Sequence, residues 1–321
     1  MSRFSLVVPV YKSSLNIQPL LKAVAALNTV LGGELEAVFV VDGSPDDSYA
    51  QLRDSLPGSP FASQLLLLSR NFGSFGAIRE GLAVARGQYF AVMAADLQEP
   101  PELVRQFFHC LANEPYDVVF GQRESRADPL PSRMASSIFW WLYRHLVQKE
   151  VPPGGVDVFG CNRVFRDQLL ALAESNSSLV GLMFWIGFRR KAIGYARQSR
   201  QLGKSAWTFS GKLKYLMDSI FAFSDVPIRL LTFAGALGLI TSTVMGTVVF
   251  IAKLMGLISV PGYAQTVITF VFFGALNSFG LGILGSYLWR TFENTKRRPL
   301  AIVMQKEAWQ EQGATNLERV Q

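Results

Sequence analysis

The chain has 321 residues, half of them hydrophobic, and carries a formal net charge of +7 at pH 7. This length and apolar content provide a sizeable core, and long uncharged stretches near the C-terminus exclude an entirely soluble protein. The basic residues gather beside those stretches, as in membrane proteins, so the positive charge does not indicate a nucleic acid partner. The two cysteines, Cys110 and Cys161, lack the spacing of a metal site and are expected to be reduced apolar fillers.

Apolar strand patterns alternate with helical patterns through the first part of the chain. Strands are expected over residues 4–10, 35–41, 64–69 and 89–95, and helices over residues 16–31 and 74–85. The alternation predicts an α/β fold with a mostly parallel sheet that is covered on both faces. A helix from Pro101, a strand over residues 117–121, a polar loop with two arginines, and an aromatic-rich helix over residues 132–147 follow. The aromatic residues of that last helix suit either a core or contact with lipid headgroups.

Polar side chains follow three of the expected strands. Asp42 ends the second strand, Arg70 and Asn71 end the third, and Asp96 ends the fourth. Parallel order brings these ends to one edge of the sheet, where two carboxylates and a guanidinium can bind a nucleotide and its diphosphate. The alternative is that each group is a turn or cap residue, and the segment after Asp96 would by itself suit the start of a helix.

Asp157 is a single carboxylate in an apolar setting that is rich in proline and glycine. It is a candidate for a buried acid with a shifted pKa. A turn carboxylate bonded to backbone amides is the competing interpretation.

Two uncharged stretches, residues 230–252 and 254–289, are each long enough to cross a hydrocarbon core of about 30 Å as a helix. Eight Lys or Arg and no acidic residue lie between Arg189 and Lys214, and four more basic residues follow the second stretch. This bias predicts a two-helix transmembrane hairpin with both chain ends in the cytoplasm. Residues 211–226 have the pattern of an amphipathic helix at the bilayer surface, with a soluble-core helix as the alternative. The tail after Pro299 suits an extended arm or a short packing segment.

Five motifs occur in order along the chain: VPVY (residues 8–11), VDGSPD (41–46), LSRNFG (68–73), DLQEPPE (96–102) and GKSAW (203–207). With these motifs and the expected hairpin, the chain from about residue 4 to residue 298 resembles the polyprenyl-phosphate glycosyltransferases. Those are inverting GT-A enzymes related to dolichol-phosphate mannose synthase and to bacterial bactoprenol glucosyltransferases. The resemblance implies a Rossmann-like GT-A catalytic domain over residues 1–210, a juxtamembrane amphipathic helix over 211–226, a transmembrane hairpin over 227–290 (about 230–252 and 266–289) and a cytoplasmic tail over 291–321.

The resemblance also implies a role for each matching residue. The positions implied to contact the nucleotide and donor are Pro9, Tyr11, Asp42, Arg70, Asn71, Ser205 and Trp207, with Asp42 at the base. Asp96 and Gln98 match the positions that hold Mg²⁺ or Mn²⁺ on the donor diphosphate, and oxygen ligands suit both ions. Arg200 and Lys204 belong to a loop that closes over the diphosphate.

The acceptor side of the site is implied in the same way. Arg123 and Arg126 match arginines near the acceptor phosphate, and Asp157 matches an acidic residue that faces it. Because a lipid phosphate is already anionic near neutral pH, we expect Asp157 to position the acceptor or the metal rather than to remove a proton. The catalytic set expected from the sequence is thus Asp96, Asp157, Arg200 and Lys204.

The sequence departs from the family pattern at two places that bear on the site. Ala94 stands where the family commonly has the first carboxylate of an Asp-x-Asp pair, and Ala206 stands where a lysine often precedes the tryptophan. One metal-facing carboxylate is therefore missing, whereas Lys204 can supply the cation of the closing loop.

These features together predict transfer of one hexose, with inversion, from a nucleotide sugar such as a UDP-sugar to an undecaprenyl- or dolichyl-type phosphate. A processive polysaccharide synthase is an alternative, but its Gln-x-x-Arg-Trp motif is absent from the sequence. A non-catalytic, nucleotide-binding membrane scaffold is another alternative, and Ala94 is its support. The expected partners are the nucleotide sugar, the lipid phosphate and the membrane. Small residues on the hairpin leave a homo-oligomer open.

Overall fold

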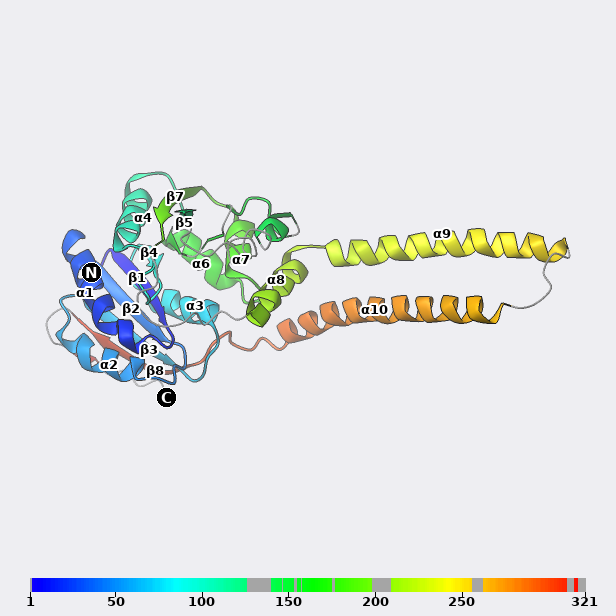
Figure 1. The fold of residues 1–321 in the computed structure, drawn as a ribbon. Coiled ribbons are helices and arrows are strands. Elements are labelled where there is room, and N and C mark those ends of the chain that lie inside the picture. Colours follow the sequence, from blue (N-terminus) through cyan, green and yellow to red (C-terminus); the bar gives the residue numbers. More distant parts are fainter. Residues whose placement is uncertain are drawn as a thin grey trace.

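The computed structural model describes residues 2–125, 140–145, 147–152, 155–156, 158–174, 177–197, 209–255, 262–310 and 315–316. It consists of an α/β domain from which two long helices extend side by side (Figure 1). The strands of the domain form one sheet in the order β7-β5-β6-β4-β1-β2-β3-β8-β9.

Four parallel strands form the centre of the sheet: β1 (Phe4–Val10), β2 (Leu35–Val41), β3 (Ala62–Leu68) and β4 (Tyr89–Val92). Their sequences are nearly continuous apolar runs, as expected for strands covered on both faces, and every residue of β2 is buried. The fourth strand ends earlier than predicted. Its partner β6 pairs only with residues 89–91, and the chain then turns away toward Asp96.

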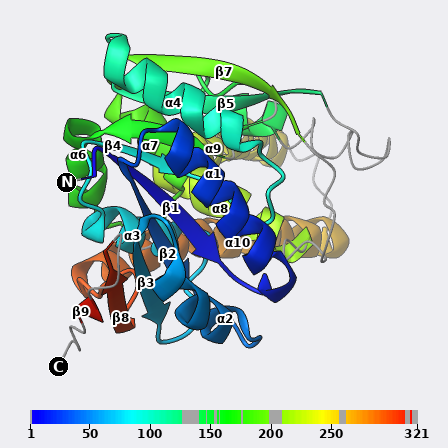
Figure 2. The same ribbon diagram turned by 90° about the vertical axis from the view of Figure 1, so that its left-hand side faces the viewer.

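Helices cover both faces of this sheet. On one face lie α1 (Ile17–Val30), α2 (Ser48–Ser55) and α4 (Pro101–Asn113), which share one apolar cluster with the sheet (Figure 2). On the other face lie α3 (Ser74–Val84), α6 (Arg163–Ala171) and α7 (Leu179–Ile186), which share the second cluster. Short 3-10 helices span Ser14–Asn16 and Leu56–Gly58. The two-faced core predicted from the strand–helix alternation is confirmed.

The second half of the domain adds β5 (Val118–Ser125), β6 (Phe159–Asn162) and β7 (Arg190–Ala196). β6 is antiparallel to both β4 and β5, and β7 is parallel to β5. Consequently β5 and β7 point in the same direction as the four central strands. The prediction of a mostly parallel α/β sheet is confirmed, with antiparallel pairs on both sides of its centre.

The C-terminal segment returns to the sheet after the long helices. β8 (Val303–Trp309) pairs antiparallel with β3 and carries the short strand β9 (Thr315–Asn316) on its outer side. The Tyr49 hydroxyl oxygen lies 2.7 Å from the Gln305 side-chain oxygen and 2.6 Å from a Glu307 carboxylate oxygen, and its single proton is donated to one of them at a time. Of the two forms considered for the tail, the packing segment is the one present, because β8 covers the edge of β3 that would otherwise be open.

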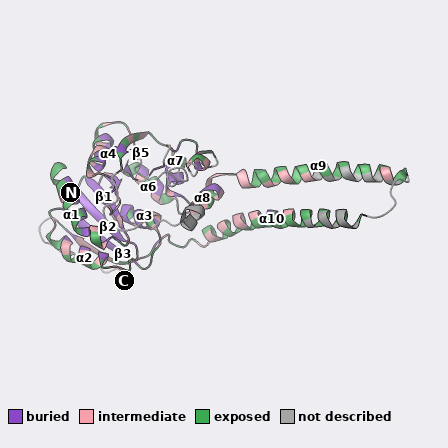
Figure 3. Ribbon diagram, in the orientation of Figure 1, coloured by how far each residue is buried: buried purple, intermediate pink, exposed green. Residues whose placement is uncertain are grey.

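Three helices lead away from the domain: α8 (Phe209–Phe223), α9 (Val226–Leu254) and α10 (Tyr263–Thr295). Many large apolar side chains of α9 and α10 are exposed, including Phe233, Phe270 and Leu288, in contrast to the buried strands (Figure 3). Within the described residues, no individual helix combines the length with the apolar content needed to cross a membrane. Residues 215–223 and 226–238, which meet at 74°, have them only as a pair.

Candidate active site

The carboxyl ends of six strands, β1 to β5 and β7, lie along one edge of the sheet, which we call the site edge. It carries these residues, in chain order: Pro9, Tyr11, Asp42, Arg70, Asn71, Asp96, Gln98, Arg123 and Arg197. The common edge expected for Asp42, Arg70 and Asp96 is therefore present.

Asp46 ties together the turns that follow β1 and β2. Its carboxylate accepts hydrogen bonds from the Ser14 amide at 3.0 Å and from the hydroxyls of Ser44 and Ser48 at 2.6 and 2.7 Å. Burial alone would raise the pKa of Asp46, but these hydrogen bonds hold it well below its ordinary value. The amide of Lys12, a residue with φ of 51°, donates to Ser44 Oγ at 2.7 Å. This network holds Pro9 and Tyr11, both half-buried, at a defined place beside the end of β2.

Asp42 joins the end of β2 to the loop after β3. Its two carboxylate oxygens accept the backbone amides of Phe72 and Gly73 at 2.7 and 2.8 Å. Burial raises the pKa of Asp42, and the two amide bonds and the charge of Arg70 oppose that rise. The next residue, Gly43, has φ of 55°, and a Cβ there would lie 2.3 Å from the Arg70 carbonyl carbon. Only glycine allows the two strand ends to approach so closely.

Arg70 is exposed at the end of β3. Its guanidinium lies 4.0 Å from the centroid of the Phe72 ring and donates to the Asn71 carbonyl at 3.2 Å. Stacking on the ring keeps the planar cation at the site edge while it stays accessible to an anion.

The turn after β4 presents Asp96 and Gln98. Leu97 between them has φ of 53°, a conformation that is uncommon for a residue with a side chain, and the Gln98 amide donates to Asp96 at 3.3 Å. Gln98 is buried, and its side-chain oxygen accepts the Arg197 guanidinium at 2.5 Å. Arg197 directly follows β7, so this contact joins the last strand of the site edge to β4.

The residues present fit a divalent cation. A carboxylate at Asp96 and an amide oxygen at Gln98 are oxygen donors of the kind that Mg²⁺ and Mn²⁺ prefer. Ala94, half-buried at the start of the same turn, supplies no ligand. Gln98 Oε1 can bind a metal ion only if its hydrogen bond to the Arg197 guanidinium breaks. A metal cation and a guanidinium at the same oxygen would compete for its lone pairs and repel each other.

Arg123 is half-buried on β5, in register with Tyr195 of β7. It was expected in a polar loop, but β5 extends through it because β7 offers backbone partners as far as Ala196. The other predicted site residues lie outside the described residues: Arg126, Asp157, Arg200, Lys204, Ser205 and Trp207.

One group away from the site edge has side chains of the types that bind metals. The ligand atoms of His109, Cys110 and Glu114, on and just after α4, lie within 4.8 Å of one another. However, the Lys191 ammonium lies 2.6 Å from Glu114 and already neutralises that carboxylate. Burial raises the pKa of the Cys110 thiol, which disfavours the thiolate form that binds metals. The cysteine was expected to be an apolar filler, and both cysteines are indeed unpaired and buried.

Sequence reasoning missed Arg197. It treated residues 189–214 as one basic stretch and did not recognise the strand over residues 190–196. The alternation of polar and apolar residues in that strand is weak, so its direction, and the place where it ends, became visible only from its pairing with β5.

Residues 5–172, which include the described site edge from Pro9 to Arg123, match the model of glycosyl transferase family 2. The chain belongs to glycosyl transferase family 2. The family's region ends before β7, so Arg197 lies outside it.

Relatives of this glycosyltransferase match nearly the whole chain. CsbB of Bacillus subtilis, which carries the name of a glycosyltransferase, is 32% identical over 95% of this chain and 91% of its own. A prophage bactoprenol glucosyl transferase homolog of Escherichia coli is 26% identical over 94% of this chain and 98% of its own. An undecaprenyl-phosphate 4-deoxy-4-formamido-L-arabinose transferase of Klebsiella pneumoniae is 27% identical, with coverages of 92% and 91%. The resemblance drawn from the motifs is thus confirmed.

Among solved structures, the mannosyltransferase PcManGT from Pyrobaculum calidifontis, in complex with GDP-Man and Mn²⁺, is similar with a TM-score of 0.44. The two chains are 15% identical, and the alignment covers 89% of this chain and 87% of that one.

Proposed function

We propose that this glycosyltransferase transfers one hexose from a nucleotide sugar, a UDP-sugar by preference, to a polyprenyl phosphate with inversion at the anomeric carbon. The observation that carries the proposal is the site edge itself, where the ends of six strands gather carboxylates and guanidinium groups. The relatives named as a bactoprenol glucosyl transferase homolog and an undecaprenyl-phosphate transferase suggest the class of acceptor, a polyprenyl phosphate.

The donor fits along the site edge from β1 to β4. The half-buried side chains of Pro9 and Tyr11 offer apolar surface for a base, and the exposed Arg70 offers charge for the diphosphate. Both carboxylate oxygens of Asp42 accept hydrogen bonds from backbone amides, which fixes the shape of this half of the site. The remaining lone pairs of these oxygens can accept hydrogen bonds from the base. In this proposal the anomeric carbon lies toward Asp96 and β5.

Transfer requires stabilisation of the leaving nucleoside diphosphate. A phosphate oxygen of the acceptor forms the new bond to the anomeric carbon while the bond to the diphosphate oxygen breaks, and attack from the opposite face inverts the configuration. A divalent cation held by Asp96 and Gln98 would neutralise charge on the leaving diphosphate. Arg197 supplies a further cation at this corner. No general base is required, because the acceptor oxygen is already anionic.

The proposal also places α9 and α10 across a membrane as a hairpin, with the domain and both chain ends in the cytoplasm. Helices of 29 and 33 residues exceed the length needed for a hydrocarbon core of about 30 Å. Their exposed apolar side chains suit lipid better than water. At the domain end of the hairpin, Trp289 lies beside Lys296, a pairing typical of a membrane–water interface.

The test is a transfer assay on the full chain in detergent, with radiolabelled nucleotide sugars and polyprenyl phosphate in the presence of Mn²⁺. The expected result is a chloroform-soluble lipid phosphate sugar with one donor of the panel. Calorimetry of nucleotide binding runs beside it. Binding without any lipid-linked product would instead support the scaffold alternative.

A further inference from the structure

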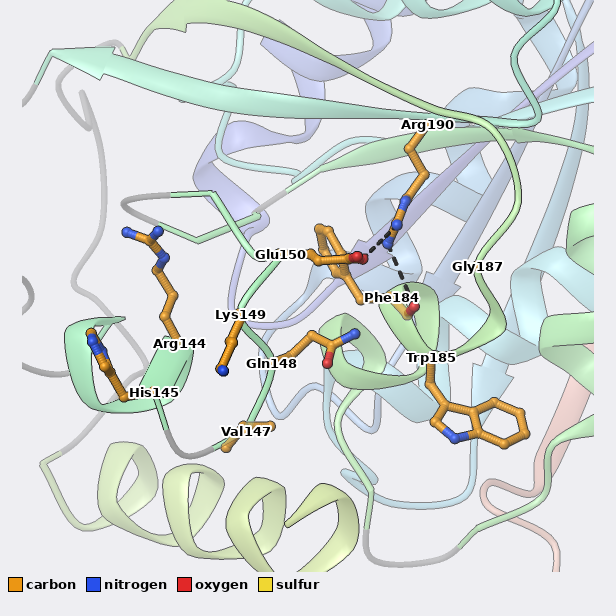
Figure 4. A pocket seen from close by; sticks show the side chains of 10 residues that line it. All are labelled: Arg144, His145, Val147, Gln148, Lys149, Glu150, Phe184, Trp185, Gly187 and Arg190. Carbon is orange, nitrogen blue, oxygen red and sulfur yellow. Dashed lines mark hydrogen bonds and ion pairs between the residues drawn. The ribbon is translucent and has the colours of Figure 1, made fainter.

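A basic pocket opens on the domain between residues 144–150, the end of α7 and the start of β7 (Figure 4). Its volume is about 620 Å³, and we call it the cationic pocket. It is lined by Arg144, His145, Val147, Gln148, Lys149, Glu150, Phe184, Trp185, Gly187 and Arg190. The lining includes none of the residues of the site edge, so the pocket has no part in the donor site described above.

The pocket has an excess of positive charge. Its lining holds three cationic side chains, Arg144, Lys149 and Arg190, and a single carboxylate, Glu150, which pairs with Arg190 at 2.5 Å. Within the described part of the chain, Arg144 and Lys149 have no ion-pair partner, and the Arg144 Nε is buried without a hydrogen-bond acceptor. Two cations at a pocket without a carboxylate partner of their own among the described residues favour an anionic ligand that accepts hydrogen bonds.

The pocket lies next to α8, which leads directly into α9. The hydroxyls of Tyr143 and Ser178 are 3.1 Å apart, and those of Ser178 and Tyr215 are 2.6 Å apart. A Cβ on Gly181 would lie 2.3 Å from the Phe223 ring, so α7 packs directly on the end of α8. α7, whose end lines the pocket, therefore lies beside α8, the helix that leads out of the domain into α9 (Figure 1).

Two tryptophans are exposed beside the pocket. Trp185, in its lining, is 65% exposed, and Trp141, whose ring lies 4.5 Å from that of His145, is 57% exposed. Exposed tryptophans are unusual on a surface that meets only water, and they are enriched where a protein meets lipid headgroups. They provide an apolar rim around a cationic centre.

We propose that the cationic pocket binds the phosphate headgroup of an anionic phospholipid of the cytoplasmic leaflet. The inference rests on the membrane placement in the proposed function. Arg144 and Lys149 contact the phosphate, and Trp185 and Trp141 lie among the glycerol and upper acyl groups. The domain is thereby held against the bilayer at a second point, apart from the hairpin, which keeps the site edge at one height above the membrane.

The experiment titrates the full chain in detergent with short-chain phosphatidylglycerol, short-chain phosphatidylcholine and inorganic phosphate, and native mass spectrometry counts the bound molecules. We expect wild-type protein to bind phosphatidylglycerol about tenfold more tightly than phosphatidylcholine, and Arg144→Gln/Lys149→Gln to remove that preference. The matched control is Lys22→Gln/Arg53→Gln, which removes the same charge from α1 and α2 on the opposite side of the domain (Figure 1). This control is expected to retain the preference for phosphatidylglycerol.

Three results would overturn the proposal. One is equal binding of the two lipids by the wild type, which needs no variant and so does not depend on variant folding. Another is an equal loss of preference in the pocket variant and the control, which indicates a net-charge effect. A third is displacement of the lipid by millimolar phosphate, which indicates a free-phosphate site. The transfer assay separates this inference from the proposed function, since the pocket variant keeps every residue of the site edge.

Discussion

At the scale of single residues, the contact between Arg197 and Gln98 decides how charge is arranged at the donor corner. The guanidinium occupies the amide oxygen that was expected to bind the metal, at 2.5 Å. Since Ala94 removes one carboxylate from the same turn, this corner is more positive than the family pattern implies. Arg197 and a divalent cation would thus compete for the same atom, Gln98 Oε1. Both are positively charged, so either one favours binding of an anionic diphosphate.

We expect Arg197→Gln to lower kcat/KM for transfer by about 100-fold, because a cation facing the leaving diphosphate is lost. Arg197→Lys should recover part of this loss. The control is Arg105→Gln on α4, a partly exposed arginine whose guanidinium pairs with Glu102 at 2.5 Å. Full activity in Arg197→Gln would show that this side chain does not face the donor.

Asp96 and Ala94 make a paired prediction about the metal. Asp96→Ala should abolish transfer, because the only carboxylate of the turn from residue 94 to residue 98 is removed. Ala94→Asp should be tolerated and should shift the Mn²⁺ titration to lower concentration, because a second oxygen ligand is added. The readout is transfer rate against Mn²⁺ concentration. A titration that Ala94→Asp leaves unchanged would show that residue 94 does not face the ion.

Asp46 makes a prediction about pH. Its folded-state pKa is lowered, so its hydrogen bonds stabilise the fold above the ordinary carboxyl pKa and are lost as pH falls through the lowered value. Asp46→Asn should therefore lower the free energy of unfolding by about 1–3 kcal/mol at pH 7. The difference from wild type should shrink as the pH is lowered below about 4. Thermal unfolding across this pH range measures both, and a difference that grows on acidification would contradict the assignment.

At the scale of elements, β8 connects the end of α10 to the strand that carries Arg70. The Ser69 amide donates to the Ile302 carbonyl at 3.0 Å, one residue before Arg70, and Ala301 is buried against Gly76 of α3. A strand that arrives from the C-terminal tail thus completes the support of the site edge. This support comes from the pairing of β8 with β3, and no sequence motif within β8 indicates it.

The two ends of β8 allow a matched test of this support. Trp309 is 5% exposed and packs in the core beside β3, whereas Met304 on the same strand is 52% exposed. Trp309→Ala should lower the free energy of unfolding by about 3–5 kcal/mol, because a large buried side chain is removed. Met304→Ala should change it by less than about 0.5 kcal/mol. Similar losses in both variants would indicate that β8 does not pack as described.

At the scale of the whole molecule, the domain and the hairpin are joined through α8. Arg290 of α10 donates to Asp218 of α8 at 2.7 Å, and the Tyr287 hydroxyl donates to the Ser224 carbonyl at 3.2 Å. The chain therefore leaves the domain along α8 and α9 and returns along α10 to the same corner. In the proposed function, a long lipid acceptor would approach the domain from the side of α9 and α10.

The hairpin predicts a specific pattern of chemical labelling. In intact cells, Gly262→Cys, at the turn before α10, should react with a membrane-impermeant maleimide added outside. Lys22→Cys on α1 should react only after permeabilisation, because the domain is proposed to be cytoplasmic. Both native cysteines are buried, so the background is low. Reaction of both introduced cysteines in intact cells, or of Gly262→Cys only after permeabilisation, would contradict the proposed topology.

Much of this arrangement is determined by local sequence. Continuous apolar runs interrupted by turn residues are sufficient to place β1 to β4 and the helices α1 and α3, because local periodicity reports burial on one or both faces. The short helix α2 was not predicted. The polar residues at the strand ends followed from the parallel order alone. The ranges 230–252 and 266–289 likewise fall within α9 and α10, since uncharged stretches of that length form long helices.

Only the tertiary structure decided which distant strands meet. β6 lies between β4 and β5 and is antiparallel to both, so β5 and its parallel partner β7 run in the same direction as β4. Their carboxyl ends therefore bring Arg123 and Arg197 to the site edge. The return of β8 to β3 and the docking of residue 143 on α8 are also long-range pairings. These pairings could not be predicted from the sequence, because backbone hydrogen bonds and buried contacts between distant segments leave no periodic pattern in either segment. Sequence by itself therefore determined the common edge of Asp42, Arg70 and Asp96 and the two long C-terminal helices, and the fold determined that Arg197 joins that edge.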